Sequence, residues 1–456
     1  MFRYAYFEAD WRREALRTNL WVVPALETVV ILVLFVVTYA TDRSAYEGHI
    51  HFPDWVLSGT ADTARVILTT IAAAIITVIG IVFSITIVVL TLASTQFGPR
   101  MLRNCVRDVG TQAALGAFVA TFCYTMITLV SVGGGGDKGD FVPHLSITVA
   151  LVLTMANVGV LVYFLNHVAV MIQLPVVIAA IAKTLNNEIE AQNRGATPGE
   201  LIEGGPSCED LLARLAESGA PIRTPRSGYL QVIRMDKLTK VATKANAVIE
   251  LPYRPGHFLV AGQVMARVWP AGAAGAVQKY LTSGHIAGAY RTLPQDISFG
   301  VDQLVEIALR ALSPAVNDTF TGMTCVDWIA DGLCRISRSW HPQRVRLDQR
   351  GEIRVIAYQP NFDRLVQRAF DTVRQAAAGM PAILIRQLDA LVKIIEQTPD
   401  RSRQTVLMRQ ADAIQKLNLE TVADPRDRDD VTRRYDAVMR LIHSNAMSTP
   451  SKISAG

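Results

Sequence analysis

The feature that most constrains this chain is a long apolar stretch from Val66 to Gln96 that contains no charged residue. A helix needs roughly 20 apolar residues to cross a hydrocarbon core about 30 Å thick. This stretch is half as long again, and as a helix with a rise of ~1.5 Å per residue it would extend for about 45 Å. The sequence therefore predicts a membrane-spanning helix that is tilted or continues beyond the bilayer.

Three further apolar stretches have the length of a membrane span. Hydrophobic residues make up 50% of the 456 residues, and almost all the continuous apolar sequence precedes Lys183. The charged remainder is long enough for a separate soluble domain. The predicted fold class is an α-helical membrane protein followed by an α+β domain with C-terminal helices, and the four predicted transmembrane helices are 20–40, 66–96, 112–132 and 145–171.

Basic residues near the span ends predict the orientation of the chain, because cytoplasmic connections carry an excess of Lys and Arg. The connection after the first span has only Arg43 and Arg65, and the third connection has only Lys138. The basic residues of the other two segments are Arg3, Arg12, Arg13 and Arg17 before the first span and Arg100, Arg103 and Arg107 after the second. Both termini and the α+β domain are therefore predicted to be cytoplasmic.

The second span is rich in small and hydroxyl-bearing side chains. Helices that face lipid have no need of such side chains, whereas helix–helix contacts and water-filled cavities do. Two interpretations stay open: the hydroxyl groups face a path shared by several copies of the chain, or they pack against neighbouring helices. The candidate pore or helix-packing residues are Thr70, Thr77, Gly80, Ser84, Thr91 and Gln96.

Two charged features lie in or beside the spans. Glu27 is the only acidic residue inside a span, where an ionised carboxylate is costly. It is interpreted either as an ion or proton site or as a side chain that reaches the interface or pairs with a nearby arginine. After the second span, Arg100, Arg103 and Arg107 surround an apolar helical pattern. This pattern predicts a short surface helix that anchors to anionic lipid or couples the spans to the cytoplasmic domain.

After the spans, the sequence changes from helical to strand-like and back. The fourth span is predicted to continue as a helix with a kink near Pro175. The segment from Arg254 to Ala266 resembles the strand–turn–strand unit of lipoyl- or biotinyl-type modules, without the lysine that those carriers modify. The predicted organisation is an interfacial segment at 1–19, a transmembrane domain at 20–182, a helix extension and linker at 183–225, a small β-barrel-like module at 226–272, a helical domain with one further strand at 273–443, and a disordered tail at 444–456.

The stretch 295–327 is the most distinctive sequence after the spans. Its apolar residues have helical spacing until a Ser-Pro pair, and Asp318 or Thr319 is well placed to cap a second helix. Its acidic and amide side chains supply enough oxygen ligands for a cation, although turn and cap roles are usual for such residues after a proline. The candidate residues of this motif are Asp296, Asp302, Ser313, Pro314, Asn317, Asp318 and Asp327.

Other function classes lack their sequence signals. The five cysteines are widely spaced without a CxxC pair, so they predict no disulfide framework. The net charge of +5 is mild, and no basic patch with interleaved aromatic residues indicates nucleic-acid binding. No nucleophile elbow, Walker loop, HExxH motif or paired-carboxylate arrangement is present. We therefore predict that the protein is not an enzyme and has no cofactor, no metal centre and no nucleic-acid partner.

Two stretches carry a resemblance to a known family. Residues 83–112, FSITIVVLTLASTQFGPRMLRNCVRDVGTQ, and residues 295–327, QDISFGVDQLVEIALRALSPAVNDTFTGMTCVD, resemble the two hallmarks of the bacterial predicted membrane proteins grouped as domain of unknown function 2254. The order of segments also fits, up to about His443. The resemblance implies a multi-pass protein of the bacterial plasma (inner) membrane with a cytoplasmic domain, and it supplies no catalytic residues.

The residues favour one functional hypothesis and leave a second open. The first is an oligomeric channel or transport-like protein with a cytoplasmic regulatory domain, because one apolar helix cannot enclose a pore and several copies must surround it. The alternative is a membrane-anchored sensor or scaffold whose cytoplasmic domain binds a ligand or partner protein. The expected partners are the lipid bilayer, further copies of the chain, and an ion or small ligand.

Overall fold

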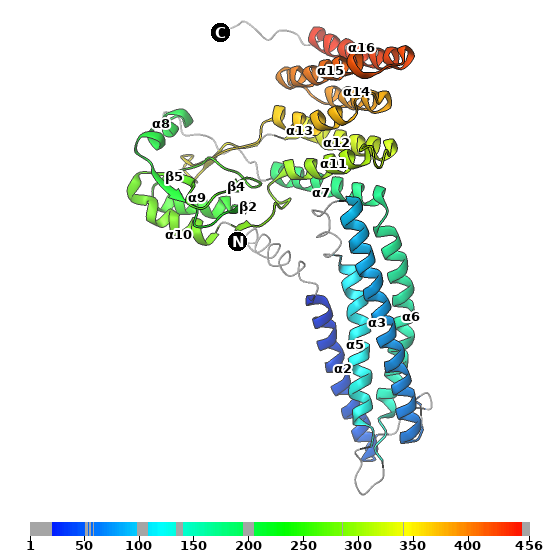
Figure 1. Cartoon of the computed structure of the whole chain (residues 1–456). Helices are drawn as coiled ribbons and strands as arrows, with labels where there is room; N and C mark the ends of the chain where they lie inside the picture. Colours follow the sequence, from blue (N-terminus) through cyan, green and yellow to red (C-terminus); the bar gives the residue numbers. More distant parts are fainter. Residues whose placement is uncertain are drawn as a thin grey trace. The chain divides into compact units, whose positions relative to one another are not determined.

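The computed structural model describes residues 21–50, 53, 56–57, 59–97, 108–133, 140–194, 205–284, 286–340 and 342–448. The chain divides into two compact units, which we call the N-terminal unit (up to Val176) and the C-terminal unit (from Val177) (Figure 1).

The N-terminal unit contains four helices that are long and apolar enough to cross a membrane, as the sequence predicts. In Figure 1 they run side by side, and α5 packs against each of the other three. The first helix continues beyond the predicted end of its span at residue 40. The four helices are α2 (Val22–Tyr46), α3 (Ala61–Phe97), α5 (Val109–Ser131) and α6 (His144–Met171).

Small residues and buried polar contacts hold these helices together. Gly116 of α5 lies so close to α2 that an added Cβ atom would be 2.9 Å from the Cα atom of Pro24. The buried carboxylate of Asp42, in the last turns of α2, accepts hydrogen bonds from the backbone N–H groups of Leu145 at 2.8 Å and Ser146 at 2.9 Å. Because the first N–H groups of a helix have no partner within it, Asp42 caps α6 from a different helix.

The helix after the last span is separate from it. The sequence predicts one long helix with a kink near Pro175, whereas α6 ends at Met171 and α7 runs from Leu174 to Arg194. Pro175 is the second residue of α7, where a missing backbone N–H has no effect on the helical hydrogen bonds. Helix α7 is therefore a separate helix, and two residues lie between it and α6.

The strands form two sheets. The five-stranded sheet has the order β1-β5-β3-β8-β7, and the three-stranded sheet has the order β4-β2-β6. The described residues form no closed barrel, so the predicted barrel-like module is not confirmed. The strands are β1 (Ala220–Arg223), β2 (Gly228–Val232), β3 (Val248–Leu251), β4 (Phe258–Leu259), β5 (Val264–Trp269), β6 (Ile286–Gly288), β7 (Val345–Leu347) and β8 (Ile353–Ala357).

The five-stranded sheet is extended by a strand from much later in the chain. β8 pairs in parallel with β3, and Ile249 lies opposite Val355. Both side chains are fully buried in an apolar cluster that also includes Leu238. Three short helices accompany the strands: α8 (Cys208–Ser218), α9 (Met235–Lys244) and α10 (Ala274–Gly284).

Six further helices complete the C-terminal unit. Neighbouring helices contact one another in a stack that ends with α16 (Figure 1). The last helix ends at Ser448, and residues 449–456 lie outside the described part of the chain. The six helices are α11 (Ile297–Ala311), α12 (Thr319–Ser339), α13 (Phe362–Ala376), α14 (Pro381–Glu396), α15 (Arg401–Thr421) and α16 (Pro425–Ser448).

Candidate functional site

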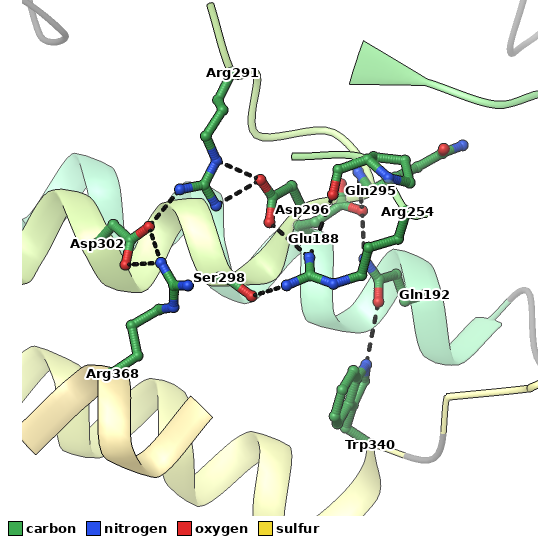
Figure 2. A network of polar contacts seen from close by, with 11 residues as sticks. Glu188, Gln192, Arg254, Arg291, Gln295, Asp296, Ser298, Asp302, Trp340 and Arg368 are labelled. Carbon is green, nitrogen blue, oxygen red and sulfur yellow. Dashed lines mark hydrogen bonds and ion pairs between the residues drawn. The ribbon is translucent and has the colours of Figure 1, made fainter. Parts of the chain in front are cut away.

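An extended polar network of the C-terminal unit surrounds Asp296, at the start of α11 (Figure 2). The side chain of Asp296 is 0% exposed and lies between two guanidinium groups. Arg254 donates to its Oδ1 atom at 3.1 Å, and Arg291 donates to its Oδ2 atom from Nη2 at 2.7 Å and from Nε at 2.9 Å. A buried carboxylate is tolerated when it is paired and hydrogen-bonded in this way.

A second carboxylate extends the network. Arg291 also donates to Asp302 at 2.5 Å, and Arg368 of α13 donates to both oxygens of Asp302 at 2.6 and 2.8 Å. Burial acts to lower the pKa of Arg291, but the adjacent carboxylates of Asp296 and Asp302 outweigh it and raise the pKa above its ordinary value. Three arginines and two aspartates thus alternate across the β3–β4 connection, the β6–α11 connection, α11 and α13. We call these five residues the Arg–Asp network.

A glycine makes room for this arrangement. Gly256 has a φ of +95°, which side-chain-bearing residues rarely adopt. A Cβ atom at this position would overlap the carboxylate of Asp296. The turn that carries Arg254 therefore needs glycine both for its backbone conformation and for the space that Asp296 occupies.

The residue before Asp296 connects the network to α7. Gln295 has a φ of +63°, and its side-chain amide bonds to both backbone groups of Ile233 at 3.0 and 3.1 Å. Its own N–H donates to Glu188 at 2.9 Å. Further along α7, Gln192 accepts a hydrogen bond from the indole of the buried Trp340 at 3.1 Å (Figure 2). Helix α7 is therefore hydrogen-bonded to a residue just before the start of α11 and to the residue after the end of α12.

An apolar contact also connects α7 to α11 and α12. Leu185 is 1% exposed and fits against two glycines, one on each helix of the α11–α12 pair. A Cβ atom on Gly300 would lie 2.9 Å from its Cδ1 atom, and one on Gly332 would lie 3.1 Å from its Cδ2 atom. Next to it, Asn186 donates to Asp331 of α12 at 2.6 Å. Helix α7 is therefore seated in a notch between α11 and α12.

The structure brings together only part of the motif at 295–327. Asp296 and Asp302 share the Arg–Asp network. Asp318 caps α12 as predicted, because it accepts a hydrogen bond from the N–H of Thr321 at 3.0 Å. The turn before it contains Ser313, Pro314 and Asn317, whose φ is +50°. Asp327 lies on α12 near Arg386 and Lys393, at 3.6 and 4.0 Å. The side chains whose oxygen atoms were candidate cation ligands are thus distributed over separate parts of the C-terminal unit.

The small residues of the second span lie along one exposed face of α3. Each hydroxyl donates to the backbone carbonyl four residues earlier, over 2.8 to 2.9 Å. A Cβ atom on Gly80 would meet nothing within 4 Å. The residues with these self-bonded hydroxyls are Thr70, Thr77, Ser84 and Thr91.

The remaining candidate residues of the spans are less well defined. Glu27 packs against Gly116 of α5, and its Oε2 atom is buried without a hydrogen-bond partner among the described residues. This leaves its proposed role as an ion or proton site open. The side chain of Gln96 and the whole of Arg100, Arg103 and Arg107 lie outside the described part of the chain.

Comparison with known proteins now decides the family. The model of the predicted membrane protein family DUF2254 matches residues 17–393, which include both hallmark stretches. The chain belongs to this family. It is 32% identical over 380 residues to uncharacterized proteins Mb1321c of Mycobacterium bovis and Rv1290c of Mycobacterium tuberculosis, with 82% of this chain and 71% of each relative covered. No solved structure matches it. Helices α15 and α16 lie beyond the matched region.

Several residues of this DUF2254 site were not identified from the sequence. Arg254, Arg291 and Arg368 supply every cation of the Arg–Asp network, and none lies within the 295–327 stretch. The signal that points to them is indirect: acidic residues next to a buried helix need cations near by. Nothing in the local sequence of Arg368 marks it, because its partner Asp302 is 66 residues earlier.

A histidine beside the network gives the fold a dependence on pH. His257 lies 5.8 Å from the ring of Tyr253 and 5.7 Å from that of Tyr358. Burial lowers the pKa of His257 below its ordinary 6.5, and the positive charge of Arg254 adds to this effect. The folded protein therefore favours the neutral imidazole.

We expect stability to fall as the pH drops below 6.5, because the unfolded chain then binds a proton that the folded chain binds less readily. The stabilisation from neutral His257 is complete above the pKa that its imidazole has in the unfolded chain. It is lost as the pH falls through the lower pKa of the folded chain. The melting temperature of the native protein should therefore decrease between pH 7.5 and pH 5 more steeply than that of His257→Gln, measured in the same detergent. Parallel pH profiles for the two proteins would contradict this role of His257.

Proposed function

We propose that this DUF2254 protein is an oligomeric channel or transport-like protein of the bacterial inner membrane, with both termini and the C-terminal unit in the cytoplasm. The observation that carries the proposal is the exposed face of α3, where four hydroxyl-bearing residues recur every seven positions. Residues seven apart on an α-helix differ by only about 20° in direction. Thr70, Thr77, Ser84 and Thr91 therefore follow one line along the helix, and all four are exposed.

The packing within the chain supports contact between copies at this face. α3 buries its opposite side, including Leu68, Ile75 and Val82, against the neighbouring helices. The line of hydroxyls is not covered by α2, α5 or α6. Small side chains let helix backbones approach closely in a bilayer, and a hydroxyl that donates to its own helix still presents an oxygen lone pair. Several α3 helices around a common axis would line a path with such oxygens.

The C-terminal unit supplies a basis for regulation. Helix α7 begins two residues after the last span and is held by Leu185 and by hydrogen bonds to α12 and to the start of α11. A rearrangement of α11 and α12 would act on α7 first. The alternative, a membrane-anchored sensor or scaffold, is favoured by a hollow between α7, α12 and α14 that is described below.

Enlarging the proposed contact face is the direct test. We expect Thr77→Leu and Ser84→Leu to lower the single-channel conductance of the protein in planar bilayers by about tenfold or more, which corresponds to ~1.4 kcal/mol in the barrier to conduction. The matched control is Ile76→Phe, which adds bulk one residue away on a different side of α3.

The oligomeric state should be measured in parallel, as mass in nanodiscs. The channel is supported if the protein is a symmetric oligomer that shows discrete conductance steps and if both substitutions reduce the size of these steps. A silent monomer, or conductance that neither substitution alters, contradicts the channel and favours the sensor or scaffold.

A further inference from the structure

A hollow of about 570 Å³ lies between α7, α12 and α14 in the C-terminal unit. Sites for small molecules usually measure about 300–1,000 Å³, so the hollow has the size of a small-ligand site. Its lining combines acidic, basic and apolar side chains. The residues that line it are Ile189, Glu190, Asp327, Ala330, Asp331, Cys334, Arg335, Arg338, Ser339, Lys393, Glu396 and Gln397.

The charges of α12 are separated along the hollow. Its lining face carries Asp327 and Asp331 first and then Arg335 and Arg338, at spacings of four, four and three residues. Side chains three or four residues apart lie on the same face of a helix. With a rise of ~1.5 Å per residue, the Cα atoms of Asp327 and Arg338 are about 16 Å apart along the axis, so a molecule of the size of an amino acid contacts only part of this row of charges.

Some of these groups have no partner that would neutralise them. The side chains of Arg338 and Glu396 form no hydrogen bond or ion pair with any residue that the structure describes. The Oδ1 atom of Asp327 is buried and accepts no hydrogen bond among the described residues, although two cations lie 3.6 and 4.0 Å away. Arg338 and Glu396 are therefore the charges of the hollow that a ligand of opposite charge would neutralise.

Part of the lining is apolar and unreactive. Ile189 and Ala330 are buried at the hollow, next to the thiol of Cys334. Burial raises the pKa of Cys334 to about 11, with the charge of Asp331 adding to it, so the thiol is protonated at neutral pH. Since the thiolate is the nucleophilic form of cysteine, this arrangement is suited to binding and not to covalent chemistry.

We propose that this hollow binds a small zwitterionic molecule of the size of an amino acid or a dipeptide. Its ammonium group would lie near Glu396 and its carboxylate near Arg338, the two charged side chains of the hollow that have no partner among the described residues. A purely anionic molecule would face four carboxylates and a purely cationic molecule three cations, whereas a molecule with both charges complements a lining of mixed charge. The proposal does not depend on ion conduction, and α7 contributes Ile189 and Glu190, so binding would contact the helix that follows the last span.

Calorimetric titration of the full-length protein in detergent tests the proposal. The probes are glycylglycine and the twenty common amino acids. For glycylglycine, glycylglycinamide lacks the carboxylate and N-acetylglycylglycine lacks the ammonium group. We expect at least one zwitterionic probe to bind, and its analogues with one charge removed to bind at least about tenfold more weakly, as for the loss of ~1.4 kcal/mol.

Two substitutions test which side chains bind the charged groups of the ligand. Arg338→Gln and Glu396→Gln should each weaken binding of the zwitterionic probe by about tenfold. Both side chains are exposed at the rim, so the fold should be retained, and an unchanged melting temperature checks this. Arg440→Gln, an exposed residue of α16 outside the hollow, is the control. Absence of binding by every probe, equal binding of the singly charged analogues, or unchanged affinity in both variants would overturn the proposal.

Discussion

Replacing Asp296 with asparagine is expected to lower the free energy of unfolding of the C-terminal unit by about 3–5 kcal/mol. The carboxylate is fully buried and neutralises both Arg254 and Arg291. Removing one partner of a buried ion pair leaves the other charge uncompensated, and this cost exceeds that of the lost hydrogen bonds alone. Hydrogen exchange of the α11 amides in the full-length protein, followed as a function of denaturant, measures the difference.

A surface ion pair provides the matched control. Glu420 and Lys416 lie one turn apart on α15, at 3.9 Å, with both side chains mostly exposed. Such pairs contribute between 0 and about 1 kcal/mol because water and salt screen them. Glu420→Gln should therefore have little effect. If Asp296→Asn changed the stability no more than Glu420→Gln does, the Arg–Asp network would have no special structural role.

Replacing Leu185 with alanine is expected to destabilise the contact of α7 with α11 and α12 by about 2–5 kcal/mol. The leucine fills the space left by Gly300 and Gly332, and neither glycine has a side chain that can move into the cavity. Loss of buried methyl groups then adds an unfilled volume to the loss of apolar burial. The amides of α7 should exchange faster in Leu185→Ala, measured in the full-length protein.

The control for this substitution is Leu419→Ala, because Leu419 is 57% exposed on α15. Exposed positions of this kind usually change stability by less than about 0.5 kcal/mol. If neither substitution changed the protection of the α7 amides, the notch formed by Gly300 and Gly332 would not hold α7. In that case the proposed route from α11 and α12 to the spans would be wrong.

Composition alone predicted the spans, because a bilayer demands about 20 apolar residues whatever surrounds them. The longer strands were predicted where strand-like runs are bounded by Gly and Pro turns, as in β5 and β8. Three shorter strands were missed. β1 contains Pro221 at a sheet edge, where a proline is tolerated, and β6 and β7 have only three residues each. No periodicity can be recognised over such lengths.

The candidate site was predicted only where its chemistry is local. The cap at Asp318 depends on residues three positions apart, and a following helix makes it recognisable. Two partners of Asp296 and Asp302 come from the β3–β4 connection and α13, which are distant in sequence, and the third, Arg291, is close in sequence but lies outside the recognised stretch. Nothing in the local sequence marks Gly300 and Gly332, because their role depends on a leucine of a third helix. Tertiary packing, and not local pattern, therefore defines most of the site.

The parallel pairing of β3 with β8 also has a consequence for biosynthesis. β3 ends at Leu251, and its partner strand ends at Ala357, more than a hundred residues later. During translation, one edge of β3 therefore stays open until the ribosome has added α11, α12 and β8. An open strand edge is a template for pairing with other chains. A chain that terminates before β8 should therefore expose this edge and be a target for quality-control proteases.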